Sequence, residues 1–200
     1  RSLEGAYEVT AVSYHAYALV HRRYALLTAG SSMGEDYGPI VVSRPGALKG
    51  GSLEGKRIAI PGLMTSAYLA LRLHQRDFHP EVVPFDRILE SVRAGAVDAG
   101  LVIHEGQLTF AEEGLELVVD LGKWWRKETG LPLPLGGNAI RRDLGMDRMR
   151  EIGRLLKGSI EYGLAHREEA LDHAQSYGRG LDREKVDRFV GMYVNARTVD

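Results

Sequence analysis

A histidine stands where the sequence predicts the end of a buried strand. Residues 101–103 form a short apolar run bounded by glycines, and His104 follows directly. Such a run is typical of a strand buried on both faces inside a parallel sheet. Ligands of open α/β sheets bind just beyond the carboxyl ends of the strands. Because an unperturbed imidazole titrates near neutral pH, His104 is a candidate catalytic base.

Two structural roles for His104 compete with catalysis. The imidazole could lie in the core and cap the strand, or it could pair with the neighbouring Glu105. Both alternatives stay open at the level of the sequence, because a strand-end position alone does not separate a base from a structural histidine.

Two segments with hydroxyl groups follow other predicted strands. Thr65 and Ser66 come after the strand 57–60 and precede a predicted helix. The first turn of a helix leaves backbone N–H groups unpaired and favours an anion, so this turn is a candidate carboxylate or phosphate site. Ser13 follows the predicted strand 7–12 in the same way. Both segments also fit an ordinary helix cap.

Several other chemistries lack the residues that they need. The sequence has no cysteine, which excludes a thiolate nucleophile and a cysteine-based metal or iron–sulfur site. Its 7 histidines show no spacing that places two ligands on one helix face, and no HExxH motif occurs. The segment 61–67 lacks the lysine and glycine spacing of a P-loop, and no GxSxG motif surrounds Ser13. We therefore expect neither a metal nor a cofactor.

The composition is that of an ordinary globular protein. Of the 200 residues, 44% are hydrophobic and 26% are charged, and 26 basic residues nearly balance 27 acidic ones. Because the charges balance, the protein has no overall positive electrostatic field that would attract nucleic acid or an anionic membrane. No apolar stretch is long enough to cross a bilayer. We expect a small-molecule carboxylate as partner, with no nucleic acid and no membrane. The lack of cysteine fits a reducing location such as the cytoplasm. No pattern indicates an oligomeric state.

The order of the predicted elements divides the chain into two lobes. Strands and helices alternate through the middle of the chain, which predicts right-handed βαβ units and a parallel sheet. The proline-rich stretch 131–137 predicts an irregular crossover, because proline removes backbone donors and fixes φ. A contiguous smaller lobe, 45–137, would carry His104, and a larger discontinuous lobe would combine residues 1–44 and 138–200.

Helices are predicted toward both ends of the chain. Apolar spacing predicts a helix over 14–24, after the first strand, and three helices in the last third. Residues 1–5 resemble the tail of a helix ending at glycine, so we expect a domain that extends before Arg1. The chain crosses between the two predicted lobes twice. This connectivity is typical of hinged solute-binding proteins, in which the ligand lies between the lobes.

Six stretches, in the same order along the whole chain, carry a family resemblance. They are 13–17, 85–88, 100–105, 122–125, 129–136 and 193–196. Together they resemble the 1,4-dihydroxy-6-naphthoate synthase family of the futalosine route to menaquinone. This resemblance implies a two-lobe α/β fold of the periplasmic-binding-protein-like type II class, with parallel-rich sheets and a hinge. It also implies a carbon–carbon lyase that converts cyclic dehypoxanthine futalosine to 1,4-dihydroxy-6-naphthoate.

The resemblance also assigns roles to particular residues. It places the catalytic base on His104 and substrate contacts on Ala11-Val12-Ser13 and Thr65-Ser66-Ala67. Many relatives carry a lysine at the position of Ala11, so a charged contact made there is lacking here. The resemblance also implies that the family's domain continues past Asp200. In the implied reaction, the helix start holds the substrate carboxylate and His104 removes a hydroxyl proton. The carbon–carbon bond then breaks in a retro-aldol sense, driven by aromatisation, while lobe closure excludes water.

Two other functions stay open. Chorismate dehydratase shares the fold and the pathway, although the His104-Glu105 pair and the Trp124-Trp125 segment favour the naphthoate synthase. A non-catalytic binding protein for a small aromatic carboxylate would use the same lobes. Turnover of a substrate would exclude that binding protein, and assays with both substrates would separate the two enzymes.

Overall fold

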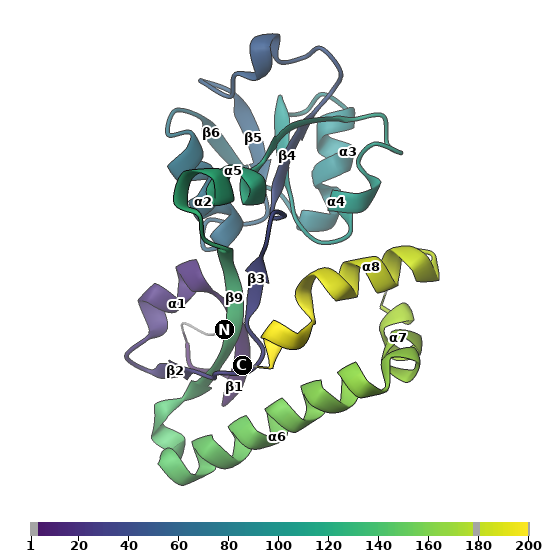
Figure 1. The fold of residues 1–200 in the computed structure, drawn as a ribbon. Helices are drawn as coiled ribbons and strands as arrows, with labels where there is room; N and C mark the ends of the chain where they lie inside the picture. The colour runs from purple at the N-terminus through teal and green to yellow at the C-terminus, as the bar shows by residue number, and fades with distance from the viewer. Residues whose placement is uncertain (1–3, 178–180, 200) are drawn as a thin grey trace. The chain divides into compact units, whose positions relative to one another are not determined.

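The structure is a computed structural model that describes residues 4–177 and 181–199 (Figure 1). The chain forms two compact units. Each unit is built around its own β-sheet, one with four strands and one with five. The helix tail expected at residues 1–5 lies for the most part outside the described residues.

Unit 2 comprises residues 34–133 and carries His104, and unit 1 combines residues 1–33 with 134–200. The contiguous lobe expected from the sequence, 45–137, stays a prediction, because the compact units report where the chain packs and not where a hinge lies. Among the described residues, no helix has the length and apolar character needed to cross a membrane.

The five-stranded sheet of unit 2 has the order β6-β5-β7-β4-β8. Its strands are β4 (Ile40–Ser43), β5 (Arg57–Ile60), β6 (His79–Val82), β7 (Ala99–Val102) and β8 (Glu116–Asp120). β5 pairs in parallel with β6 and β7, whereas β4 pairs antiparallel with β7 and β8. Four strands, β5, β6, β7 and β8, therefore run in one direction, as the expected parallel sheet requires, and the expectation is wrong only for β4. β4 runs against its neighbours because no helical crossover brings it into the sheet.

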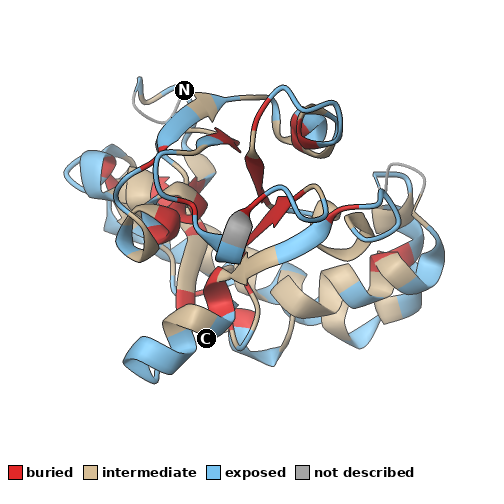
Figure 2. Cartoon of the chain, turned by 90° about the horizontal axis from the view of Figure 1, so that it is seen from above, coloured by how far each residue is buried: buried red, intermediate tan, exposed pale blue. Residues whose placement is uncertain are grey.

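The helices of unit 2 are α2 (Ser66–His74), α3 (Ile88–Arg93), α4 (Gly106–Thr109) and α5 (Leu121–Thr129), with 3-10 turns η1 (Lys49–Gly51) and η2 (Phe85–Arg87). Every residue of β4 and β7 is buried, and burial along the chain is coloured in Figure 2. One hydrophobic core cluster gathers residues from β4, β5, β7 and α3. This core supports the edge of the sheet at which His104 lies.

The sheet of unit 1 is antiparallel around its central strand. Its strands are β1 (Val9–Ser13), β2 (Tyr24–Leu26), β3 (Ser32–Gly34) and β9 (Leu133–Arg141). β1 and β2 flank β9 and run against it, and β3 also pairs with β9. A parallel-rich sheet is thus wrong for this unit. The helices are α1 (Tyr14–Val20), α6 (Met146–Ala165), α7 (Arg167–Gln175) and α8 (Arg183–Tyr193), with 3-10 turns η3 (Arg142–Leu144) and η4 (Ala196–Thr198).

The helix predicted over 14–24 is too long. α1 ends at Val20, and Tyr24 begins the short strand β2. Tyr24 is buried, pairs with Arg141 of β9, and donates its hydroxyl hydrogen to the carbonyl of Tyr7 at 2.7 Å. Its helical spacing from the apolar residues of α1 was therefore misleading, because a strand partner far along the chain determines its conformation.

The irregular backbone predicted over 131–137 is wrong, although the chain does pass from unit 2 to unit 1 within this stretch, between Leu133 and Pro134. β9 runs through most of this stretch and forms the centre of the sheet. Pro134 is tolerated because it precedes Gly136, where the register with Ser13 of β1 begins. The missing N–H of the proline therefore costs no hydrogen bond to β1 or β2. The three helices predicted in the last third of the chain are confirmed.

Candidate active site

The carboxyl ends of three parallel strands lie side by side at one edge of unit 2. β5 pairs in parallel with both β6 and β7, so the loops that follow the three strands leave the sheet at the same edge. Thr65 follows β5, Phe85 follows β6 and His104 follows β7. Two of the predicted site segments of this unit, Thr65-Ser66-Ala67 and His104, thus come from neighbouring strand ends.

His104 lies two residues beyond β7 in an uncommon backbone conformation. Its φ is 60°, in the left-handed region that few residues other than glycine adopt. The residue is exposed, so the alternative of a core histidine is wrong. Its imidazole packs on the ring of Phe85, with the ring centroids 4.7 Å apart and the planes at 55°. An exposed imidazole with a defined neighbour at a strand end is suited to proton transfer.

A tight turn after His104 returns the chain to the sheet. The His104 carbonyl accepts a hydrogen bond from the Gln107 N–H at 3.1 Å, and α4 begins at Gly106. A Cβ at Gly106 would lie 2.7 Å from Cγ1 of Val102, which is too close for any side chain. Glycine therefore lets α4 start against the end of β7, and His104 occupies the tip of the turn.

Thr65 is the N-cap of α2. Its Oγ1 accepts from the Tyr68 N–H at 3.1 Å and donates to the Gly62 carbonyl at 2.8 Å. The hydroxyl of Thr65 therefore caps the helix, which is one of the two roles that the sequence left open for this segment. Ser66 and Ala67 are buried in the first turn. The helix dipole is positive at this end, which makes the turn electrostatically favourable for an anion.

The segment Ala11-Val12-Ser13 forms the last part of β1 in unit 1. It pairs with residues 136–138 of β9. Val12 is buried and Ala11 is exposed, whereas Ser13 is half-buried and its Oγ accepts from the Ala16 N–H at 3.1 Å. Ser13 is thus the N-cap of α1, in the same role that Thr65 has for α2. The segment belongs to a different sheet from Thr65 and His104.

Two contacts near the predicted residues were missed from the sequence. Phe85 meets the His104 ring, and the Tyr14 hydroxyl donates to Ser31 Oγ at 2.9 Å. A Cβ at Gly137 would lie 3.2 Å from the Tyr14 hydroxyl, so this pair lies against the strand partner of Val12. The only signal for either contact was the resemblance at 13–17 and 85–88, which marks segments and not contacts.

His74, another histidine of unit 2, packs against an aromatic side chain. His74 packs edge to face on Trp124, with ring centroids 4.9 Å apart. Within the described part of the chain, its buried Nδ1 has no hydrogen-bond partner, and burial lowers the pKa of the ring. No group of three or more His, Asp or Glu side chains among the described residues is placed to hold a metal ion.

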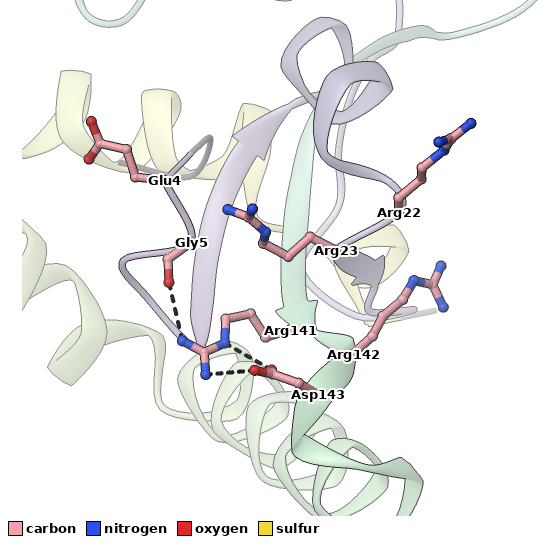
Figure 3. A pocket seen from close by; sticks show the side chains of 7 residues that line it. All are labelled: Glu4, Gly5, Arg22, Arg23, Arg141, Arg142 and Asp143. Carbon is pink, nitrogen blue, oxygen red and sulfur yellow. Dashed lines mark hydrogen bonds and ion pairs between the residues drawn. The ribbon is translucent and has the colours of Figure 1, made fainter.

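A charged pocket of about 370 Å³ lies in unit 1, away from the predicted site residues. It is lined by Glu4, Gly5, Arg22, Arg23, Arg141, Arg142 and Asp143 (Figure 3). The Arg141 guanidinium donates to both carboxylate oxygens of Asp143 at 2.9 Å and to the Gly5 carbonyl at 3.1 Å. Hydrogen bonding to Arg141 lowers the pKa of Asp143. These contacts identify a surface ion pair that ties β9 to the start of the chain.

Relatives of known name match the chain over nearly its whole length. A protein of Thermus thermophilus named 1,4-dihydroxy-6-naphtoate synthase is 46% identical over 199 residues, which cover 100% of this chain and 72% of the relative. A protein of the same name from Streptomyces coelicolor is 34% identical over 202 residues, covering 98% of this chain and 71% of the relative.

Several solved structures are similar to this chain over nearly its whole length. A protein of Archaeoglobus fulgidus has a TM-score of 0.93 at 48% identity and covers 100% of this chain and 74% of its own. An alkanesulfonate-binding protein from Xanthomonas axonopodis pv. citri, bound to MOPS, has a TM-score of 0.69 at 17% identity, over 96% of this chain and 69% of its own. A Candida albicans protein described as having the generic periplasmic binding protein fold has a TM-score of 0.65 at 12% identity, over 94% and 65%.

The distant structures show the fold alone, and they confirm the predicted α/β fold of the periplasmic-binding-protein type. The family evidence is separate and covers the complete sequence. Residues 1–200 match a protein family described as menaquinone biosynthesis. This match and the two named relatives agree with each other, and the chain belongs to the menaquinone biosynthesis family.

Proposed function

We propose that this chain is a 1,4-dihydroxy-6-naphthoate synthase, a lyase that breaks a carbon–carbon bond in menaquinone biosynthesis. The two named relatives and the family match support this activity. The structural observation that carries the proposal is the exposed imidazole of His104, which lies on the strand end next to the one that carries the Thr65 turn. The substrate that we propose is cyclic dehypoxanthine futalosine.

The substrate carboxylate binds at the first turn of α2. Support comes from the dipole of this helix, which spans Ser66–His74 and whose positive end faces the edge of the sheet that carries His104. Because the Thr65 hydroxyl is engaged with Gly62 and Tyr68, the backbone of Ser66 and Ala67 provides the contact. A carboxylate held there is anchored at a strand end that neighbours the base.

His104 acts as the base. Its imidazole accepts the proton of a substrate hydroxyl, and the oxygen that loses this proton forms a carbonyl as the adjacent carbon–carbon bond breaks. The electron pair of that bond enters the ring system, which becomes the aromatic dihydroxynaphthoate. General base catalysis of this kind contributes roughly 10²–10⁴-fold in rate. Exposure of His104 in the described structure allows a substrate to reach the ring.

We extend the proposal to Ala11-Val12-Ser13 as further substrate contacts. The family resemblance supports this assignment, together with the position of the segment at the end of β1. The side chain of Val12 is buried, so a contact from this residue uses its backbone. Ala11 is exposed and uncharged and supplies no ionic contact.

The partner of the protein is then a small-molecule carboxylate, and we place the reaction in the cytoplasm. Membership of a biosynthetic family supports this location. Cell fractionation with antibodies against the protein tests it. Recovery of the protein with the cytoplasmic fraction is expected, and recovery with the secreted or periplasmic fraction would contradict the location without affecting the activity.

The deciding experiment is incubation of the full-length protein with cyclic dehypoxanthine futalosine. We expect the absorbance of 1,4-dihydroxy-6-naphthoate to appear, and to appear at a rate proportional to enzyme concentration. Chorismate is offered in a parallel reaction, where no dehydration is expected. Turnover of chorismate alone would assign the chain to the rival enzyme, and binding without turnover of either compound would assign it to a binding protein.

A further inference from the structure

Phe85 and His104 are brought together from two different strand ends. Phe85 opens η2 after β6, and His104 lies beyond β7. The two rings have centroids 4.7 Å apart and planes at 55°. Aromatic pairs at such distances attract each other by about 0.5–1.5 kcal/mol beyond the area that they bury. Phe85 therefore restrains the imidazole at the tip of the turn after β7.

Phe85 is itself held by the core of unit 2. It is half-buried and packs against the cluster formed by buried residues of β4, β5, β7 and α3, which includes Val42, Val92 and Val102. Side chains in such a core occupy defined rotamers with few voids. The phenyl ring is thus a fixed support between the core and the imidazole.

α3, which follows the segment that carries Phe85, lies close against β7. A Cβ at Gly100 would lie 2.6 Å from Cγ2 of Ile88 and 2.7 Å from Cγ2 of Val92. Only glycine at this position lets α3 lie so close to the strand. Because η2 directly precedes α3, this approach also brings Phe85 toward the end of β7, where His104 begins its turn.

The backbone of His104 gives a second restraint. A φ of 60° is costly for a residue with a side chain, by about 1–2 kcal/mol. Such conformations persist where the surroundings determine them, and they occur often at active sites. The turn that begins at Gly106 holds the backbone, and Phe85 holds the ring. Both restraints limit the orientations that the imidazole can adopt.

We infer that Phe85 is a positioning residue for His104, which rests on the proposed function of His104 as base. The phenyl ring touches the imidazole and acts through it. Proton abstraction requires the base within about 2.6–3.2 Å of the proton's heavy atom, and a misplacement of about 1 Å can cost roughly 10²-fold in rate. Loss of the phenyl ring therefore lowers kcat and leaves substrate affinity nearly unchanged.

The test compares Phe85→Leu with Phe110→Leu in the full-length enzyme. Leucine keeps apolar bulk against the core and removes the aromatic ring. Phe110 is also half-buried against the same core cluster, so it matches Phe85 in the packing that the substitution disturbs. We expect Phe85→Leu to lower kcat at least about tenfold with KM within about twofold, because orientation acts on the chemical step. Phe110→Leu keeps kcat within about threefold, and Phe85→Tyr recovers most of the activity because it restores a six-membered aromatic ring.

A spectroscopic measurement reads the same contact without turnover. The carbon-bound ring protons of His104 are observed by NMR and assigned by the loss of their signals in His104→Asn. The ring current of Phe85 changes the chemical shifts of these protons. We therefore expect the shifts to change in Phe85→Leu and to stay the same in Phe110→Leu. This measurement also separates the inference from the proposed function, because it does not depend on the substrate.

Each outcome decides the inference. A fall in kcat at constant KM together with displaced His104 signals supports it. Unchanged His104 signals and unchanged kcat in Phe85→Leu overturn it, and a change in KM alone assigns Phe85 to substrate binding instead. If Phe85→Leu does not fold by circular dichroism, Phe85→Met, which fills the same space flexibly, takes its place. If the His104 signals move in Phe85→Leu but the wild-type enzyme turns over no substrate, the contact between the two rings is supported and the proposed function of His104 as base is rejected.

Discussion

Each unit has a histidine two residues after a strand, and the two histidines differ in what surrounds them. His15 follows the end of β1 and lies in the first turn of α1, with helical neighbours. His104 follows β7, lies outside any helix, and has a φ of 60°. A position after a strand is therefore shared, whereas the exposed turn and the positive φ distinguish His104 from His15.

The directions of the neighbouring strands explain the difference. β1 pairs with β9, which runs against it, so the end of β1 meets the beginning of the paired part of β9. β7 pairs in parallel with β5, and β5 pairs in parallel with β6. Parallel neighbours bring several loops to one edge, and antiparallel neighbours do not. His104 thus lies at an edge of the sheet to which the loops after β5 and β6 also come.

The largest effect is expected from matched substitutions of the two histidines. His104→Asn removes the base and lowers kcat by roughly 10²–10⁴-fold, whereas His15→Asn keeps kcat within about threefold. Calorimetric titration with 1,4-dihydroxy-6-naphthoate should show that His104→Asn still binds the product. An active His104→Asn variant, or equal losses at the two positions, would remove the distinction between the units.

The next effect concerns packing behind the site. Gly100→Ala places a Cβ 2.6 Å from Ile88 and destabilises unit 2 by about 1–3 kcal/mol through overpacking. Gly158, inside α6 of unit 1, would meet nothing within 4 Å on gaining a Cβ. Gly158→Ala should therefore stabilise the protein by about 0.5–1 kcal/mol through helix propensity. Urea unfolding measures both, and the same sign for the two variants would contradict the expected contrast in packing.

A smaller effect distinguishes the two helix caps. Asp and Asn are both good N-cap residues. Thr65→Asp and Thr65→Asn should therefore preserve the cap of α2, and Ser13→Asp and Ser13→Asn should preserve the cap of α1. A negative charge at Thr65 opposes the substrate carboxylate, so KM for Thr65→Asp should exceed that for Thr65→Asn by about fivefold, equivalent to roughly 1 kcal/mol. At Ser13 we expect a smaller ratio. Equal Asp-to-Asn ratios at the two positions would contradict a carboxylate site at α2.

The smallest effect is a pH dependence of stability from His74. Burial lowers the pKa of this ring in the folded state, so the unfolded chain binds the proton more readily. Its contribution to stability is therefore complete above the unfolded pKa of about 6.5 and is lost as the pH falls toward the folded value. His74→Gln should reduce the fall in the urea midpoint between pH 7.5 and 5.5. An identical fall in the variant would show that His74 does not titrate in this range.

Local signals in the sequence predicted much of unit 2. The capping residue Thr65 and the strand that leads to His104 were found because caps and apolar periodicity depend on residues only a few positions apart. The same reasoning failed at Tyr24 and at Pro134. Both lie in strands whose partners are far along the chain, and a residue's own neighbours do not report such pairing.

The chain's sequence by itself determined which residues end strands and begin helices, and its resemblance to a family pointed to His104 as the base. Only the tertiary structure decided that β5, β6 and β7 are parallel neighbours, that β4 alone runs against the other strands of this sheet, and that Phe85 meets the His104 ring. The physical reason is the range of the interactions. Hydrogen bonds of caps and turns close within one segment, whereas strand direction and ring contacts depend on packing between segments that the sequence separates.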